Sequence, residues 1–507
     1  MTIDDRATRP APAVVGSTDD IVRRAGSVPP LDGFPTLDAL AERFARIERE
    51  NPGLVSSRRV ATSRLGEPIR MYSIGTASIG AASSGAASTG TASRNHLIVG
   101  GVHPNEPIGS WTAIHLAETL CADAELRESL GAVWHIVPSI DPDGGRLNEG
   151  WFADPGDRGH YARRFYRPAP DEQVEWTFPT SYGDAYFDRV MPETLGLMRL
   201  IDELRPELYV SLHNGEMGGV YYYLSRPVPE LTEALHAVPA SLGLPLDTGE
   251  PESPYLEQYA PAVFGTGTIA DAYDYLESLG VEAAVEIGGS SSSEYASRHG
   301  TLGLVAELPY WKHPDADDTS PTDEAYSALL LRTSARMTET GEALAGLLAR
   351  AEPALTIESP FLRASRAFVP MLIRMGTVDR ARAADPASAR PATVAERFSC
   401  EDLVHCFRLR YGGMLLRALE VESAAGTASA PLRRLAEEAA VLYATWQAEA
   451  AADDRAEVIP IASLVGVQYG AVLAAAAHLA GTGRPAAAAA AADPAPTPTL
   501  PPAEGSR

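Results

Sequence analysis

Three residues of this chain combine metal-binding side chains with positions at the ends of apolar segments. His103 and Glu106 lie in GGVHPNEP, directly after the apolar segment HLIVGG, and His213 ends the apolar segment ELYVSLH. Two imidazoles and one carboxylate are a ligand set of catalytic zinc, which keeps a fourth position open for water. A zinc bound in this way polarises a carbonyl and lowers the pKa of its bound water to about 7. We therefore expect His103, Glu106 and His213 to hold one Zn²⁺ per chain.

The H-x-x-E spacing does not identify a metal site by itself. The same spacing occurs at His213 and Glu216, and at His115 and Glu118, where a helical pattern makes residues three apart surface neighbours. What distinguishes His103 is its position directly after an expected strand. Open α/β sheets bind their ligands at the carboxyl ends of their strands.

The elements that must position these residues follow an alternating pattern. Short apolar segments predict strands at 96–101, 132–140, 207–213, 281–289 and 301–310. Helical spacing of apolar residues lies between several of them, as in 108–122 and 192–204. Strands that alternate with helices predict an α/β fold with a mixed, mostly parallel central sheet flanked by helices.

Composition divides the 507 residues into four parts. Residues 1–30 are polar with scattered Pro and Gly, which predicts a disordered tail, whereas 31–320 hold the α/β pattern and the candidate zinc ligands. Residues 321–480 are rich in Ala, Leu, Arg and Glu at helical spacing, which predicts an α-helical C-terminal region. The Ala/Pro-rich residues 481–507 are expected to be disordered, and the low-complexity stretch 76–94 is expected to be a flexible surface loop.

Charge and cysteine content restrict the partners and the compartment. The net charge of −25 argues against a nucleic-acid partner, which requires a basic surface. The N-terminal residues lack the pattern of a secretory signal, and no run of 18 apolar residues predicts a membrane span. Three cysteines without a CxxC pair indicate a reducing compartment. We expect a cytoplasmic protein without a membrane or nucleic-acid partner, and the sequence names no protein partner.

Four segments resemble, in order, the landmarks of the zinc carboxypeptidase family, the carboxypeptidase A type of metallopeptidases. They are GGVHPNEP with the H-x-x-E ligands, HIVPSIDPDG, ELYVSLHNG with the third ligand, and HGTLGLVAELPYW with a glutamate at position 307. The chain looks like a divergent, bacterial member of this family. The resemblance implies a zinc carboxypeptidase-like catalytic domain over 31–320 and hydrolysis of the amide bond of a peptide or a peptide-like substrate.

Hydrolysis of an amide at zinc also needs a group that takes a proton from water and returns it to the leaving nitrogen. By the resemblance this general base and acid is Glu307. A carboxylate in an apolar strand is costly unless it is functional or paired. Glu286 in VEAAVEIGG is the rival, and Glu216 in a Gly-rich loop is a third option.

The family also stabilises the oxyanion with an arginine downstream of its N-P-D-G segment. The candidates here are Arg146, Arg163, Arg164 and Arg167, among which the sequence does not choose. We assign Arg146 to catalysis and Arg164 and Arg167 to substrate binding. A second role implied by the resemblance is the orientation of the first zinc histidine, which we assign to Asp171.

The chain departs from the family at the residues that bind the substrate's terminal carboxylate. The family's carboxypeptidases bind a terminal carboxylate with an Asn-Arg pair, and Gln173 and Val174 stand in its place here. The family's mobile tyrosine has Tyr295 as its nearest counterpart. The main hypothesis is therefore a metallocarboxypeptidase for a short peptide or peptide-like metabolite. The alternatives are a zinc amidohydrolase that deacylates an N-acyl amino acid, and a non-catalytic binding protein on the same fold.

Overall fold

A nine-stranded mixed sheet forms the centre of the protein. The computed structural model describes residues 14–75 and 94–482. In spatial order the strands are β1 (Val55–Thr62), β2 (Pro68–Ile74), β4 (Ala132–Val137), β3 (Arg94–Val99), β7 (Leu208–Leu212), β12 (Leu302–Glu307), β9 (Tyr221–Leu224), β11 (Val263–Gly265) and β10 (Gln258–Ala260). The four central strands β4, β3, β7 and β12 are parallel, and the outer strands add antiparallel pairs. The predicted fold class, a mixed and mostly parallel sheet flanked by helices, is confirmed.

Alternating side chains of the central strands pack under helices on both faces of the sheet. On β3, Ile98 belongs to the larger apolar core with α3 (Ile108–Ala122), whereas Leu97 and Val99 face the smaller core beneath α7 (Pro192–Leu204). This period of two is what a strand buried on both faces requires. The remaining helices of this part are α2 (Leu37–Glu50), α4 (Ala124–Leu130), α5 (Pro142–Arg146), α6 (Arg158–Arg164), α8 (Thr232–Ser241), α9 (Ile269–Ser278), α10 (Ala283–Glu286) and α11 (Ser292–Ser297).

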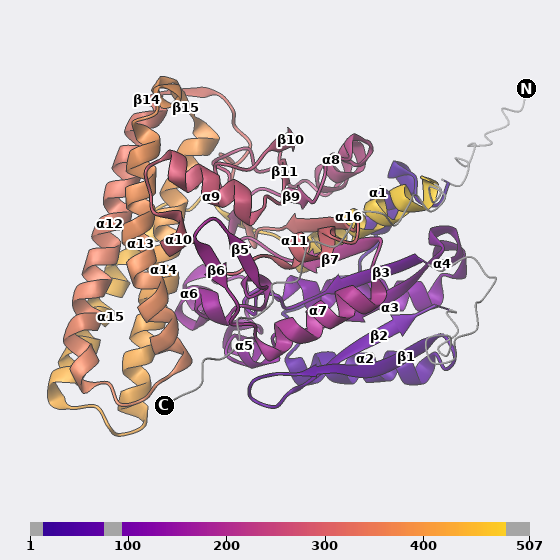
Figure 1. The fold of residues 1–507 in the computed structure, drawn as a ribbon, viewed down its shortest axis with the longest axis horizontal. Coiled ribbons are helices and arrows are strands. Elements are labelled where there is room, and N and C mark those ends of the chain that lie inside the picture. The colour runs from indigo at the N-terminus through magenta and orange to yellow at the C-terminus, as the bar shows by residue number, and fades with distance from the viewer. Residues whose placement is uncertain (1–13, 76–93, 483–507) are drawn as a thin grey trace, which may run out of the picture.

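The C-terminal region begins with a bundle of long helices beside the sheet (Figure 1). The bundle helices are α12 (Tyr326–Ala351), α13 (Pro360–Ala383), α14 (Val394–Ala424) and α15 (Ala430–Ala450). A small two-stranded sheet of β14 (Pro321–Ala325) and β15 (Pro391–Thr393) joins α12 to α14. The predicted helical region is therefore present, and its first helices form a layer of their own.

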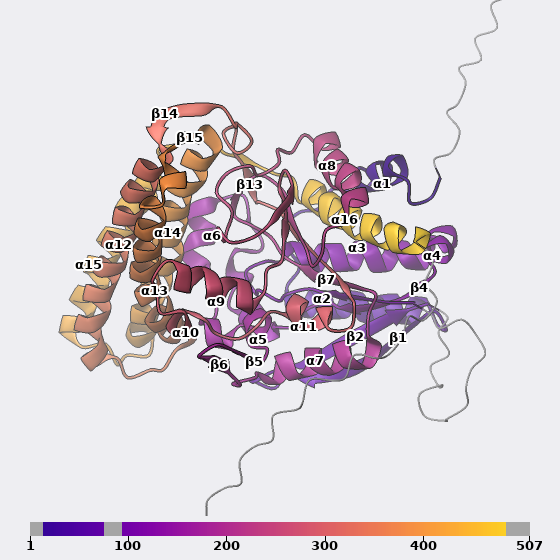
Figure 2. The ribbon, with the colours of Figure 1, turned by 45° about the horizontal axis from the view of Figure 1, so that its top comes forward.

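The last helix, α16 (Ile461–Gly481), does not join this bundle. It returns to the sheet and packs against α1 (Thr18–Ala25), α3 and α8, as both ribbon views show (Figures 1 and 2). Among the described residues, α16 is the one helix that is long and apolar enough to cross a membrane. However, 78% of its most apolar 18-residue stretch is buried inside the protein. Its apolar composition is therefore explained by its place in the core. The change of composition near Pro321 therefore does not separate α16 from the sheet, since α16 packs against α3, β7 and β12.

Two expectations need correction. Residues 14–30 of the predicted tail include helix α1, whose Ile21 and Ala25 are buried against the core and whose Asp20 pairs with Arg24 at 2.9 Å. The expected strand 281–289 is instead the short helix α10 (Ala283–Glu286) followed by extended chain. A short apolar run is compatible with either structure, and tertiary contacts decide between them.

The other expectations of disorder fall mostly on residues that the structure does not describe. These are 1–13, 76–93 and 483–507, which include most of the predicted loop 76–94 and of the predicted tail 481–507.

Candidate metal centre and active site

The three predicted ligands meet at the carboxyl ends of two neighbouring strands. β3 and β7 pair in parallel, so the loop after Val99 and the residue after Leu212 lie side by side. The Nδ1 atom of His103 lies 3.1 Å from one carboxylate oxygen of Glu106, and the Nδ1 atom of His213 lies 3.1 Å from the other. Among the described residues, these three form the one cluster of His, Cys, Asp or Glu whose donor atoms all lie within 4.8 Å of one another.

The donor set fits zinc. Ligand atoms about 2.0–2.1 Å from a tetrahedral zinc lie about 3.3 Å apart, close to the separations between Glu106 and the two imidazoles. All three side chains are buried, and burial together with the Arg167 guanidinium lowers the pKa of His103 to about 3, which keeps this imidazole neutral. Although burial opposes ionisation of Glu106, the two imidazoles hold its pKa well below its usual range. A neutral imidazole and an ionised carboxylate are the protonation states that bind a metal. Although burial opposes protonation of His213, Glu106 raises its pKa to about 9, so metal binding there must displace a proton.

A chain of hydrogen bonds behind His213 fixes its orientation. The Nε2 atom of His213 lies 2.8 Å from the hydroxyl of Ser211, which donates to Glu175 at 3.3 Å. Glu175 also accepts the hydroxyl of Ser292 at 2.7 Å. Because the Ser211 proton is used on Glu175, Ser211 accepts from Nε2–H of His213, and Nδ1 is left free for a metal. Such outer partners set the tautomer of a ligand histidine.

Sequence reasoning missed Ser211, Glu175 and Ser292. Ser211 could have been found, because it precedes His213 by two residues in a strand and so shares its face. Glu175 and Ser292 carry no such local signal, since their contacts join segments 117 residues apart. The expected orienting residue Asp171 is instead exposed on the short helix η2 (Pro170–Glu172), where it pairs with Arg189 at 3.1 Å.

Glu307 is the carboxylate that the fold brings to the metal ligands. It ends β12, the strand next to β7, and its carboxylate lies 3.7 Å from Nδ1 of His213. Burial raises the pKa of Glu307 well above its usual range. The rival Glu286 pairs with Arg374 of α13 at 2.8 Å, and Glu216 is held between two arginines.

Arg167 is the arginine that reaches the metal ligands. Its guanidinium donates to Glu106 at 3.0 Å and lies 2.8 Å from Nε2 of His103. Its Nε donates to the side-chain oxygen of Gln173 at 3.1 Å, and Gln173 is itself fixed by the carbonyl of Pro168. The residue that stands in place of the family's carboxylate-binding pair therefore holds Arg167.

The other predicted site residues lie elsewhere. Arg146 pairs with Asp38 at 2.8 Å and with Glu67 at 2.7 Å, because it ends α5 on the side that faces α2. Arg164 is exposed at the end of α6 and lines a surface depression of about 600 Å³.

Tyr295 is likewise held away from the metal ligands. Its hydroxyl donates to Asp202 of α7 at 2.9 Å, and its ring lies beneath the Arg298 guanidinium. Arg146 and Tyr295 are therefore engaged by acids outside the metal site, which corrects their assignments, whereas the assignment of Arg164 to substrate binding stays a prediction.

Comparison with known proteins finds one family model that matches part of the chain. The family model described as zinc carboxypeptidase matches residues 41–240, a range that contains all three metal ligands. The resemblance predicted from the sequence is confirmed. Members of the matched family depend on zinc.

Solved structures show more distant likenesses. A metallo-carboxypeptidase from Burkholderia cenocepacia is 16% identical with a TM-score of 0.31, and the match covers 54% of this chain and 60% of that one. The carboxypeptidase A from Helicoverpa armigera is 17% identical with a TM-score of 0.35, and the match covers 72% of this chain and 80% of that one. A search of curated proteins returned no match. Likenesses of this degree do not bear on the substrate.

Proposed function

We propose that this protein is a zinc-dependent metallocarboxypeptidase that hydrolyses an amide bond in a short peptide or peptide-like metabolite. The observation that carries the proposal is the meeting of His103, Glu106 and His213 with a second buried acid, Glu307, at the ends of adjacent strands. Zinc held by the three ligands would supply Lewis acidity at the scissile carbonyl and acidify a water molecule.

The protein's own side chains perform the proton transfers and bind the developing charge. Glu307 accepts the proton of the attacking water and delivers it to the leaving nitrogen, which one carboxylate can do in successive steps. Arg167 presents guanidinium N–H groups beside the ligands, where they stabilise the oxyanion. Hydrogen bonding by Gln173 fixes this guanidinium before substrate arrives.

The test compares wild type with Glu307→Gln on a panel of short peptides and N-acyl amino acids, with zinc content measured on each protein. We expect one zinc per chain in both proteins and a loss of activity of about 10²–10⁴-fold in the variant. Glu286→Gln is the matched control, because this rival carboxylate pairs with Arg374, and it should retain activity. Absence of stoichiometric zinc, or full activity of Glu307→Gln, would contradict the proposal.

Gln173 engages Arg167 and the backbone, so it is not free to bind a terminal carboxylate. The alternative, deacylation of an N-acyl amino acid, would use the same zinc ligands and general base, because its substrate also carries a free carboxylate next to the scissile amide. Cleavage rates of a short peptide and of an N-acyl amino acid with the same C-terminal residue discriminate between the two, since a metallocarboxypeptidase should prefer the peptide.

A further inference from the structure

The last helix of the chain reaches the strand ends that carry the active site. The side chain of Gln468, on α16, is fully buried, and its amide donates to the carbonyl of His213 at 2.8 Å and to that of Ala306 at 3.5 Å. These carbonyls belong to the third metal ligand and to the residue before Glu307. The Gln468 amide therefore joins the ends of β7 and β12 directly behind the two functional side chains.

A second contact from the C-terminal region holds the chain three residues after His213. Glu216 is buried, and its carboxylate accepts Nε of Arg158 at 3.0 Å and Nε of Arg410, on α14, at 2.8 Å. The thiol of Cys406, one helical turn before Arg410, lies 3.3 Å from the same carboxylate. A buried carboxylate is stable only with such partners, so α14 fixes the position of Glu216.

The segment from His213 to Glu216 is in turn hydrogen-bonded to Glu106 and to Tyr310, which follows Glu307 in the chain. The backbone N–H of Asn214 donates to the Glu106 carboxylate at 3.3 Å, and the carbonyl of Glu216 accepts the N–H of Tyr310 at 2.9 Å. The Tyr310 hydroxyl then donates to the carbonyl of Asn105, beside Glu106, at 2.9 Å.

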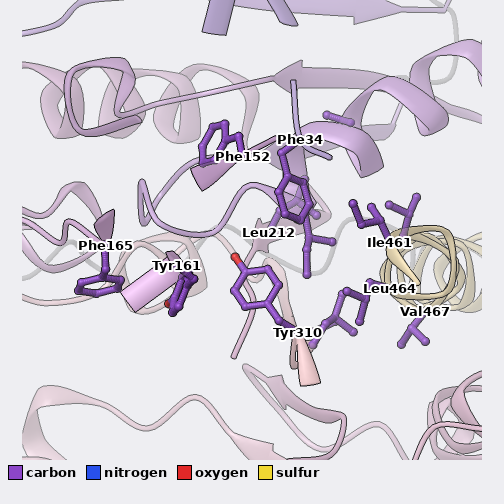
Figure 3. Packing of buried hydrophobic residues seen from close by; sticks show 14 of the residues in the cluster. Phe34, Phe152, Tyr161, Phe165, Leu212, Tyr310, Ile461, Leu464 and Val467 are labelled. Atoms are coloured by element: carbon purple, nitrogen blue, oxygen red, sulfur yellow. The ribbon is translucent and has the colours of Figure 1, made fainter. Parts of the chain in front are cut away.

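Apolar packing holds Tyr310 in that position. Its ring lies among Phe34, Phe152 and Tyr161, with Ile461 and Leu464 of α16 nearby (Figure 3). A shift of the segment 213–216 would therefore displace both metal-binding loops together.

We propose that Arg410 and Gln468 are positioning residues of the metal site. By this proposal the C-terminal helices α14 and α16 complete the site, and the helical region is more than an appendage to a finished catalytic domain. The inference rests on the proposed function, since it concerns the same ligands. It adds that residues outside the matched segment 41–240 determine how tightly the zinc is held.

The test measures the zinc dissociation constant by competition with a chromophoric chelator, together with kcat, KM and the unfolding temperature of the metal-free protein. The variants are Arg410→Gln, Arg410→Lys and Gln468→Met. Arg408→Gln is the matched control, because Arg408 is buried on the same helix but pairs with Glu449 at 2.8 Å within the bundle. Tyr469→Phe controls for Gln468, since its buried hydroxyl has no hydrogen-bond partner among the described residues.

Outer partners of metal ligands typically affect affinity by about 10–100-fold, and we expect a loss in this range for Arg410→Gln and Gln468→Met. Arg410→Lys should recover part of it, because a lysine can still pair with Glu216. Both controls should bind zinc as wild type does, even where the unfolding temperature falls. A purely structural role would lower that temperature and leave zinc affinity unchanged.

Wild-type zinc affinity in folded Arg410→Gln and Gln468→Met would overturn the proposal. Should Arg410→Gln not fold, Glu216→Gln removes the same ion pair from the other side, and the same loss of affinity is expected of it. A wild-type protein that binds no zinc would refute the proposed function before any variant is compared. The two failures are therefore distinguishable.

Discussion

Replacement of Ser211 by alanine should weaken zinc binding without removing a metal ligand. Ser211 accepts from Nε2–H of His213 at 2.8 Å and donates its hydroxyl hydrogen bond to Glu175 at 3.3 Å, which fixes the tautomer that leaves Nδ1 to the metal. Alanine keeps the β-carbon and the strand conformation. The change therefore removes one hydroxyl and the two hydrogen bonds that it makes.

The expected magnitude follows from the burial of this histidine. His213 is 5% exposed, so its Nε2–H has no access to bulk water once Ser211 is gone. An unsatisfied buried donor costs about 1–3 kcal/mol. At about 1.4 kcal/mol for each factor of ten, zinc affinity should fall by about 5- to 150-fold. This range agrees with the 10–100-fold typical of outer partners of metal ligands.

The assay is chelator competition at fixed pH on wild type, Ser211→Ala and Ser292→Ala. Ser292 is the control, because it donates to the same Glu175 carboxylate at 2.7 Å but has no hydrogen bond to His213. Both variants should lose stability, whereas Ser211→Ala should show the larger loss of affinity. Equal zinc affinity of Ser211→Ala and wild type would refute the argument that this hydroxyl sets the histidine tautomer.

Three further predictions follow from the same geometry. Arg167→Gln should lower kcat/KM by about 10²–10³-fold, as expected for loss of an oxyanion donor, whereas Arg146→Gln should leave kcat/KM unchanged. Equal effects of the two variants on hydrolysis rates would contradict the assignment of Arg167 to the oxyanion. Zinc added at 100 times its dissociation constant should stabilise the metal-free protein by about 2.7 kcal/mol in a thermal shift assay, and His213→Ala should show no such response. Burial raises the pKa of Asp141 from 3.8 to about 7, so the folded state binds the extra proton and stability should fall as pH rises between about 4 and 7. Asp141→Asn still accepts the N–H of Gly144, and its urea unfolding should depend less on pH over that range; an unchanged dependence would show that Asp141 is not the group responsible.

The sequence was informative where short segments carry both the structure and the chemistry. The ligands His103 and Glu106 are three residues apart on one loop, and His213 directly follows a strand whose apolar character is evident. Parallel pairing of β3 with β7 then brings the ligands together without further information. Glu307 and its rival Glu286 were both expected at the ends of apolar strands, and the resemblance to the family favoured Glu307.

Local sequence patterns gave wrong predictions where contacts with distant parts of the chain determine the structure. The run VEAAVEIGG has strand composition, yet its Glu286 faces Arg374 of α13 and the segment forms a short helix. Arg146 and Arg167 were equivalent candidates in the sequence. Only the fold shows that Arg146 faces acids on α2 and in the turn before β2, while Arg167 faces Glu106.

The boundary between domains was the least predictable feature, because composition and packing divide the chain at different places. Helical spacing begins near Pro321, but Glu216 and His213 find their partners 194 and 255 residues later, at Arg410 and Gln468. Without α14 the buried Glu216 would lose Arg410 and keep Arg158 as its one arginine partner among the described residues, which destabilises the buried carboxylate. Without α16 the core would lose the apolar side chains that pack over α3, β7 and β12. A chain that ended at Pro321 would thus lack both Arg410 as a partner of Glu216 and the cover of its sheet, so we expect truncation there to destabilise the metal site.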